Sequence, residues 1–111
     1  MLSIKDIAEI NKEFSSGTLV NENSLAYASS TTQRSRNWLK TAATFTKTIL
    51  IDHAFEDGNK RTTAAVIMLI MDLSKVQFDP EKIPHIIVKL LKGNITSIKE
   101  IERCIKDGIR Q

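Results

Sequence analysis

One stretch of the chain holds most of the side chains that could do chemistry together. Its nine residues run from His53 to Arg61 and read His-Ala-Phe-Glu-Asp-Gly-Asn-Lys-Arg. Histidine is the side chain that most readily exchanges a proton near neutral pH, so His53 is a candidate general base. Asp57 is a candidate ligand for Mg²⁺, which takes one or two carboxylates beside phosphate oxygens and waters.

The end of this stretch predicts an anion site. A long apolar helix is predicted from Asn59 to Leu73, which places Lys60 and Arg61 in its first turn. Cations there face the positive end of a helix and lose a few tenths to ~1 kcal/mol, a loss that a bound anion offsets. Gly58 allows successive backbone N–H groups to point at one anion, and Asn59 either caps the helix or donates to a phosphate. Arg61 would bind phosphate as a bidentate fork and Lys60 as a point charge, so a polyphosphate cradle is predicted.

The stretch resembles the signature of the Fic/Doc family. The Fic form reads His-Pro-Phe-x-(Asp/Glu)-Gly-Asn-Gly-Arg, and the Doc form has lysine in place of the last glycine. The chain departs at Ala54, where proline is usual, and carries the Doc-type Lys60. The matching positions are His53, Phe55, Asp57, Gly58, Asn59 and Arg61. The resemblance covers residues 18 to 78 best and the two ends more loosely.

The resemblance implies an all-α core with the signature at the junction of two central helices. It also implies a transferase in which His53 takes the proton from a hydroxyl of a target protein, which then attacks a phosphate of ATP or another nucleoside triphosphate. Asp57 would hold Mg²⁺, the segment from Gly58 to Arg61 would bind the phosphates, and Phe55 would anchor the loop. Lys60 favours transfer of a phosphoryl group, and the alternative is nucleotidyl transfer (AMPylation), as in the Fic form.

Further partners follow from the same resemblance. Doc-type relatives are toxins that act on translation and depend on a separate antitoxin chain, so a target protein, such as a translation factor, and an antitoxin are the implied partners. The segment from Asn21 to Ser30 lies where the family has a flap that clamps an extended target segment by strand pairing. Residues 18–23 also fit the short pattern of the family's self-inhibitory helix, with Glu22 as its acid. The target, the nucleotide and an inhibitory role for Glu22 are left open.

The length and composition of the chain indicate its general class. The 111 residues predict one domain, 1–111, with a single core. A hydrophobic content of 41% and a charged content of 26% are typical of a soluble globular protein. The net charge of +3 is a weak argument for nucleic acid. The single cysteine, Cys104, fits a cytoplasmic location, and the apolar run from Ala64 to Met71 is too short to cross a membrane.

Helical periodicity runs through the chain, which predicts an all-α bundle of five to six helices. Strand alternation is suggested only at residues 76–78. The predicted helices are Ser3–Phe14 with a Ser3/Asp6 capping box, a short turn Ser24–Ala28, Arg36–Ile51, Asn59–Leu73, Pro84–Lys92 ending at Gly93, and a last helix with a Ser97/Glu100 capping box ending at Gly108. Ser29–Ser35 is predicted as a loop, and the signature occupies the loop Asp52–Gly58.

Two rival interpretations come from other functional classes. Residues 84–106 read helix, turn, helix in a basic protein, which is the pattern of a DNA-binding motif. Its second helix would present Lys99, Glu100, Glu102 and Arg103, a mixed surface with little net positive charge, so an αα-hairpin that completes the bundle is the simpler interpretation. His85 is expected at the surface rather than in a metal site. A non-catalytic nucleotide-binding or partner-binding domain is the other alternative, and the intact His53 and Asp57 argue against it.

Overall fold

The computed structural model describes residues 2–110, and within them it contains helices, one isolated β-bridge and no strand. The all-α prediction is therefore confirmed. The elements are α1 (Ile4–Lys12), α2 (Glu22–Thr32), α3 (Trp38–Thr46), the π-helical segment η1 (Lys47–Ile51), α4 (Asn59–Leu73), α5 (Lys82–Lys92) and α6 (Ile98–Arg110). No helix of residues 2–110 combines the length and the hydropathy needed to cross a membrane.

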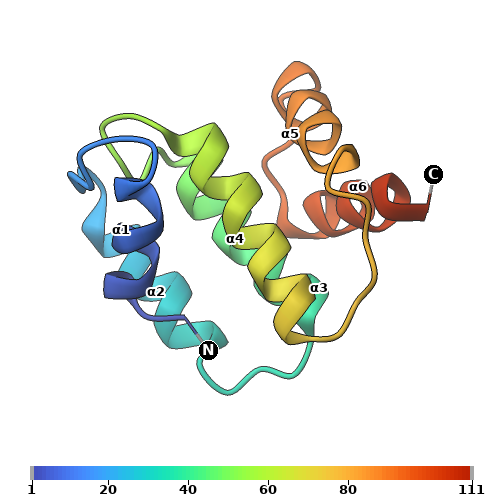
Figure 1. The fold of residues 1–111 in the computed structure, drawn as a ribbon, viewed down its shortest axis with the longest axis horizontal. Coiled ribbons are helices and arrows are strands. Elements are labelled where there is room, and N and C mark those ends of the chain that lie inside the picture. The colour runs from blue at the N-terminus through green and yellow to red at the C-terminus, as the bar shows by residue number, and fades with distance from the viewer. Residues whose placement is uncertain (1, 111) are drawn as a thin grey trace.

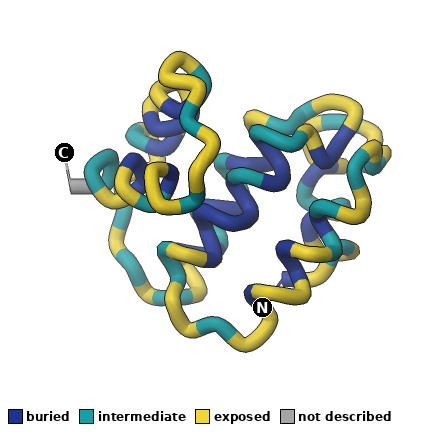
Figure 2. Tube along the Cα trace, turned by 180° about the vertical axis from the view of Figure 1, so that it is seen from behind, coloured by how far each residue is buried: buried dark blue, intermediate teal, exposed yellow. Residues whose placement is uncertain are grey.

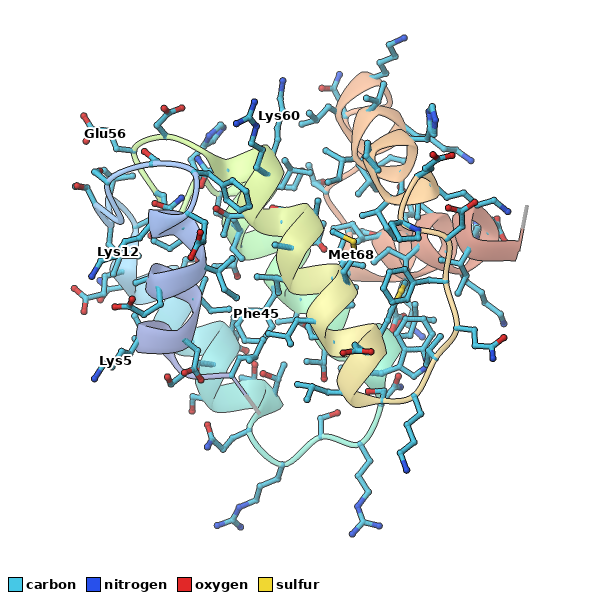
Figure 3. All side chains as sticks on the ribbon, in the orientation of Figure 1. Lys5, Lys12, Phe45, Glu56, Lys60 and Met68 are labelled. Carbon is cyan, nitrogen blue, oxygen red and sulfur yellow. The ribbon has the colours of Figure 1, made fainter. Side chains whose placement is uncertain are left out.

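Helix α4 is the centre of the bundle (Figure 1). It packs against α3 on one side, while α1 and α5 contact it from opposite flanks, and α6 packs across α3 and α5. The buried positions gather on α3 and α4 (Figure 2). Phe45 of α3, labelled in Figure 3, is fully buried in this core. The prediction that the helix after the signature is central is thus confirmed.

The first helix begins with the predicted capping box. The Ser3 hydroxyl accepts a hydrogen bond from the Asp6 backbone N–H at 3.1 Å, and the Ser3 N–H donates to Asp6 Oδ2 at 2.9 Å. The bond from the Ser3 N–H lowers the pKa of the Asp6 carboxyl, and the Ser3 hydroxyl lowers it further. These bonds fix the start of α1, whose far end reaches the signature loop.

The second helix is longer than the sequence predicted. Helix α2 covers Glu22–Thr32, so the short turn Ser24–Ala28 was too short and the loop Ser29–Ser35 was wrong over its first half. Its buried face has helical spacing despite its polar composition: Leu25, Ala28, Ser29 and Thr32. The hydroxyls of Ser29 and Thr32 donate to backbone carbonyls at 2.8 and 2.7 Å, which makes their burial tolerable.

The helix before the signature changes its winding at the end. It was predicted as Arg36–Ile51, but α3 begins at Trp38, after the Asn37 side chain accepts from the Lys40 N–H at 3.1 Å. From Lys47 to Ile51 the chain forms η1. Such π-helical segments insert one extra residue per turn and are frequent at functional sites. Here the segment ends two residues before His53.

The C-terminal half shows two differences from the sequence prediction. Helix α5 begins at Lys82, so Pro84 lies inside the first turn, where its missing N–H costs nothing. The helix ends at Lys92 with Gly93 as its C-cap, as predicted, and the left-handed residue is the following one, Asn94 (φ 49°). Gly108 does not end α6, which runs to Arg110. A Cβ at Gly108 would lie 2.3 Å from Ile86 Cγ1, so this glycine is needed for the contact between α5 and α6.

The remaining predictions for this region have clear outcomes. Residues 76–78 form no strand, and the predicted αα-hairpin is present, with α6 packed on both α3 and α5. Ile101 and Ile105 of α6 are fully buried, and His85 is exposed at the surface as expected. The Ser97 hydroxyl accepts from the Glu100 N–H at 3.1 Å at the start of α6. A helix packed on two others leaves no structural argument for a separate DNA-reading motif.

Candidate functional site

A cleft of about 590 Å³ opens at the N-terminal end of α4. Its wall is formed by the signature loop, the start of α4, the chain just after α1, and the end of α5. The lining residues are Phe14, Leu50, His53, Glu56, Asp57, Gly58, Asn59, Lys60, Arg61 and Leu91. All the side chains assigned to catalysis, metal binding or phosphate binding from the sequence therefore line one cleft.

The signature loop is held from below by Phe55. Its side chain is only 1% exposed, as expected for the anchor of the loop. The backbone at Phe55 forms an antiparallel bridge with Leu19. The Glu56 N–H donates to the Thr18 carbonyl at 3.0 Å, and the Val20 N–H donates to the Ala54 carbonyl at 2.9 Å. The loop is thus fixed to the segment between α1 and α2 by both its core side chain and its backbone.

His53 is exposed and has a left-handed backbone, with φ of 53°. Such a conformation is unfavourable for a residue with a Cβ, and it is held here by the residue before it. The Asp52 N–H closes the last turn of η1 by donating to the Lys47 carbonyl at 2.9 Å. The Asp52 carboxylate accepts from the Ser24 hydroxyl at 3.0 Å and lies 3.3 Å from Lys47 Nζ. The Asn21 amide donates to the Asp52 carbonyl at 3.0 Å.

Ala54 is the position where the resemblance expects proline. Ala54 is fully buried, and its N–H donates to the Ile49 carbonyl at 3.4 Å. Proline has no N–H and could not form this bond. The departure from the motif therefore agrees with a loop that bonds back to η1.

The start of α4 has no side-chain cap. Gly58 is the N-cap residue and has a left-handed backbone, with φ of 77°, as the turn prediction requires. Asn59 is the first helical residue, so capping, one of the two roles considered for it, is excluded. Its amide instead bonds twice to Phe55: Nδ2 donates to the carbonyl at 2.8 Å, and Oδ1 accepts from the N–H at 3.0 Å. The backbone N–H groups of the first turn therefore remain without a capping oxygen.

Lys60 and Arg61 are both exposed in this first turn. Neither side chain has a hydrogen bond or ion pair with the rest of residues 2–110. Figure 3 shows Lys60 at the start of α4, extended away from the bundle. The two cations stand beside the uncapped N–H groups of a helix N-terminus, an arrangement that favours an anion. The carboxylates of Glu56 and Asp57 line the same cleft.

Asp57 is exposed in the cleft and its carboxylate has no hydrogen bond or ion pair within the described chain. Across residues 2–110 no three side chains of the histidine, cysteine, aspartate or glutamate type lie together as a preformed metal site. One free carboxylate beside a phosphate-binding region still fits Mg²⁺, because this ion completes its shell with phosphate oxygens and waters. The donor set does not fit a structural zinc site.

Asn11 of α1 is the residue of this region that the sequence did not single out. It is fully buried, and its Nδ2 donates to both the Asp57 carbonyl and Thr62 Oγ1 at 2.9 Å. Its Oδ1 accepts from the Gly17 N–H at 2.9 Å. The available signal was its place one helical turn after Ile7 on the apolar side of α1, where an amide needs a polar partner inside the protein.

The segment upstream of the signature differs from the expectation. Residues 22–30, most of the expected flap, are helical, so they offer no extended edge to a target segment. Glu22 is the first residue of α2 and is exposed. It does not line the cleft, and the described chain contains no ion pair between Glu22 and Arg61. The geometry therefore gives no support to an inhibitory contact by Glu22.

Comparison with known proteins found no match: no family model, curated protein or solved structure is similar to this chain at a significant level.

Proposed function

We propose that this protein is a Fic/Doc-like transferase that moves a phosphoryl group from ATP or another nucleoside triphosphate to a hydroxyl of a target protein. The observation that carries the proposal is the cleft at the start of α4, where His53, Asp57 and the residues from Gly58 to Arg61 face the same space. The family resemblance is the basis for the proposed reaction, and the cleft is where the substrates would bind.

The phosphates would bind at the positive end of α4. The uncapped N–H groups offer donors to phosphate oxygens, and the left-handed Gly58 brings the backbone close. Arg61 and Lys60 have no other partner in the described chain, so binding an anion breaks no existing ion pair. Positioning and charge stabilisation are the main contributions a protein makes to phosphoryl transfer.

His53 would act on the attacking hydroxyl. As the hydroxyl oxygen forms its bond to the γ-phosphorus, a ring nitrogen of His53 accepts the hydroxyl proton. The bond between the γ-phosphorus and the bridging oxygen breaks, its electron pair stays on that oxygen, and ADP leaves. His53 then releases the proton to water. The side chain is exposed at the cleft, as a base that meets a protein substrate must be.

Asp57 would hold the Mg²⁺ that accompanies the triphosphate. When bound, this ion supplies charge neutralisation on the phosphate oxygens. Asn11 Nδ2 donates a hydrogen bond to the Asp57 carbonyl at 2.9 Å. This bond fixes the backbone position from which the Asp57 carboxylate extends.

The test is transfer of label from ATP. The chain is incubated with a cell extract and Mg²⁺, with ATP labelled at the γ-phosphate in one reaction and at the α-phosphate in another, and labelled proteins are separated by electrophoresis. We expect label from the γ-phosphate on a target protein, and none with His53→Ala. Lys75→Ala, an exposed change at the far end of α4, is the control that should retain transfer.

Each outcome separates one interpretation from the others. Label from the α-phosphate would show nucleotidyl transfer, the alternative in which the hydroxyl attacks the α-phosphorus and pyrophosphate leaves. Binding of ATP without label on any protein would favour a non-catalytic nucleotide-binding domain. As a Doc-like toxin acting on translation in the cytoplasm, the wild-type chain would arrest growth when expressed, and a cognate antitoxin would relieve the arrest.

A further inference from the structure

We infer that Asn11 is a positioning residue, which fixes the phosphate-binding half of the signature relative to the first helix. The inference that this affects transfer rests on the proposed function, but its structural part does not. Asn11 bonds to the turn just after its own helix, at Gly17, and to two neighbouring places far along the chain: Asp57 in the signature loop and Thr62 in α4.

The hydrogen bonds of Asn11 use its amide group almost completely. Nδ2 has two hydrogens, one for the Asp57 carbonyl and one for Thr62 Oγ1, and Oδ1 accepts from the Gly17 N–H. All three bonds are 2.9 Å long, and the side chain is fully buried. Buried amides that are fully bonded allow one arrangement of their neighbours, because any shift leaves a polar group unpaired.

These hydrogen bonds lie at the start of α4, so they affect the position of that helix end. Asp57 and Thr62 lie on either side of the turn at Gly58, so Asn11 bonds to the chain just before and just after the first turn of α4. A Cβ at Gly58 would lie 3.1 Å from Asn11 Nδ2, which shows how closely the amide fits under this turn. The Asn11 amide therefore sets the place of the helix start from which Lys60 and Arg61 extend.

His53 is held by other residues. Its neighbour Asp52 is bonded to Ser24, Asn21 and Lys47, none of which contacts Asn11 through a hydrogen bond in residues 2–110. Loss of the Asn11 amide should therefore move the phosphate-binding residues and leave the base in place. Kinetically, this predicts a larger effect on the KM for the triphosphate than on kcat.

The test compares two changes on the same side of α1. Asn11→Leu keeps the branched shape of the side chain but removes all three hydrogen bonds. Ile7→Ala, one turn earlier and also fully buried, lowers stability by loss of packing and keeps the Asn11 bonds. Both variants are characterised by thermal melting, by hydrogen exchange of residues 55–62, and by calorimetric titration with Mg²⁺ and a non-hydrolysable ATP analogue.

We expect Asn11→Leu to speed up exchange in residues 55–62 beyond what Ile7→Ala does at equal distance below each melting temperature. We also expect a roughly tenfold or greater loss of affinity for the ATP analogue with Asn11→Leu, compared with an approximately unchanged affinity for Ile7→Ala. Equal exchange and equal affinity in the two variants would overturn the inference and leave Asn11 as an ordinary core residue.

Two further measurements cover a variant that does not fold and separate failure of the proposed function from failure of the positioning role. If Asn11→Leu does not fold, exchange is measured in the wild type, where the hydrogen bond to Asn11 Oδ1 must protect the Gly17 N–H. Rapid exchange of that N–H would overturn the inference. If the wild type binds no triphosphate while exchange in residues 55–62 still depends on Asn11, the proposed function fails and the positioning role stands.

Discussion

Replacing His53 by glycine should make the protein more stable and inactive. His53 has a left-handed backbone, with φ of 53°. A residue with a Cβ pays about 1–2 kcal/mol for this conformation, and glycine does not. Glycine in turn loses roughly 0.5–1 kcal/mol more backbone entropy on folding. The difference leaves His53→Gly about 1 kcal/mol more stable than His53→Ala.

The comparison of glycine with alanine isolates the backbone. Both variants lack the imidazole, so any contact made by the ring cancels between them, and only the Cβ remains. For a domain of this size, about 1 kcal/mol corresponds to a difference in melting temperature of about 4–8 °C. Thermal melting followed by circular dichroism at neutral pH measures this difference directly. Both variants should show no transfer of label from ATP.

Lys75 offers a matched control. It is exposed, has a left-handed backbone with φ of 58°, and lies just after the far end of α4. Lys75→Gly should also be more stable than Lys75→Ala by about the same amount, but both should retain transfer. If His53→Ala melts at the same temperature as His53→Gly while the Lys75 pair differs, His53 does not have this backbone in solution. If His53→Gly retains full transfer, the assignment of the base is wrong.

Three further changes test the rest of the cleft and the bundle. Arg61→Ala should weaken binding of the triphosphate by about 1.5–3 kcal/mol, seen by calorimetry, and should not lower the melting temperature of the free protein, because it removes a cation from the positive end of α4. Lys60→Gly restores the Fic form of the motif and should reduce γ-phosphate transfer, and mass spectrometry of the target would show whether a nucleotide is attached instead. Gly108→Ala should lower stability by about 1–3 kcal/mol in urea unfolding, since its Cβ would lie 2.3 Å from Ile86 Cγ1, and unchanged stability would show that α5 and α6 are less tightly packed.

The sequence predicted the parts of the fold that depend on apolar periodicity. Helix α4 was predicted with its observed bounds, Asn59–Leu73, because a strong apolar pattern follows a clear glycine turn. Helix α2 was predicted too short because its buried face includes Ser29 and Thr32, whose hydroxyls donate to backbone carbonyls. Single-sequence patterns treat such residues as loop formers, although a bonded hydroxyl can be buried in a helix.

Glycine predicted one helix end correctly and one wrongly. Both Gly93 and Gly108 were predicted as helix ends, from the general preference for glycine at C-caps. Gly93 is the C-cap of α5, whereas Gly108 lies inside α6, where it makes room for Ile86. Close packing between two helices and a helix end call for glycine for different reasons, and only the three-dimensional contact tells them apart.

In the candidate site, the sequence identified side chains but not their supports. The order of residues in the signature was sufficient to group His53, Asp57 and Arg61, since they lie within nine positions of one another. Asn11 and Ser24 come from α1 and α2, and only the fold brings them to the loop. A lone asparagine or serine has many structural roles, so the sequence gives little reason to link either one to the signature.

The start of α4 breaks several local rules within a few residues. His53 has a left-handed backbone, the helix has no capping side chain, and within residues 2–110 Lys60 has no partner at its positive end. Lys75 and Asn94 are also left-handed, and α2 and α5 also begin without a side-chain cap. The start of α4 differs from these places because it combines such features with two cations. Local rules are most often broken at functional sites, where a ligand restores what the chain lacks. A phosphate group would supply oxygens to the free N–H groups and a counter-charge to the lysine in one step, which neither a cation nor an apolar ligand could do.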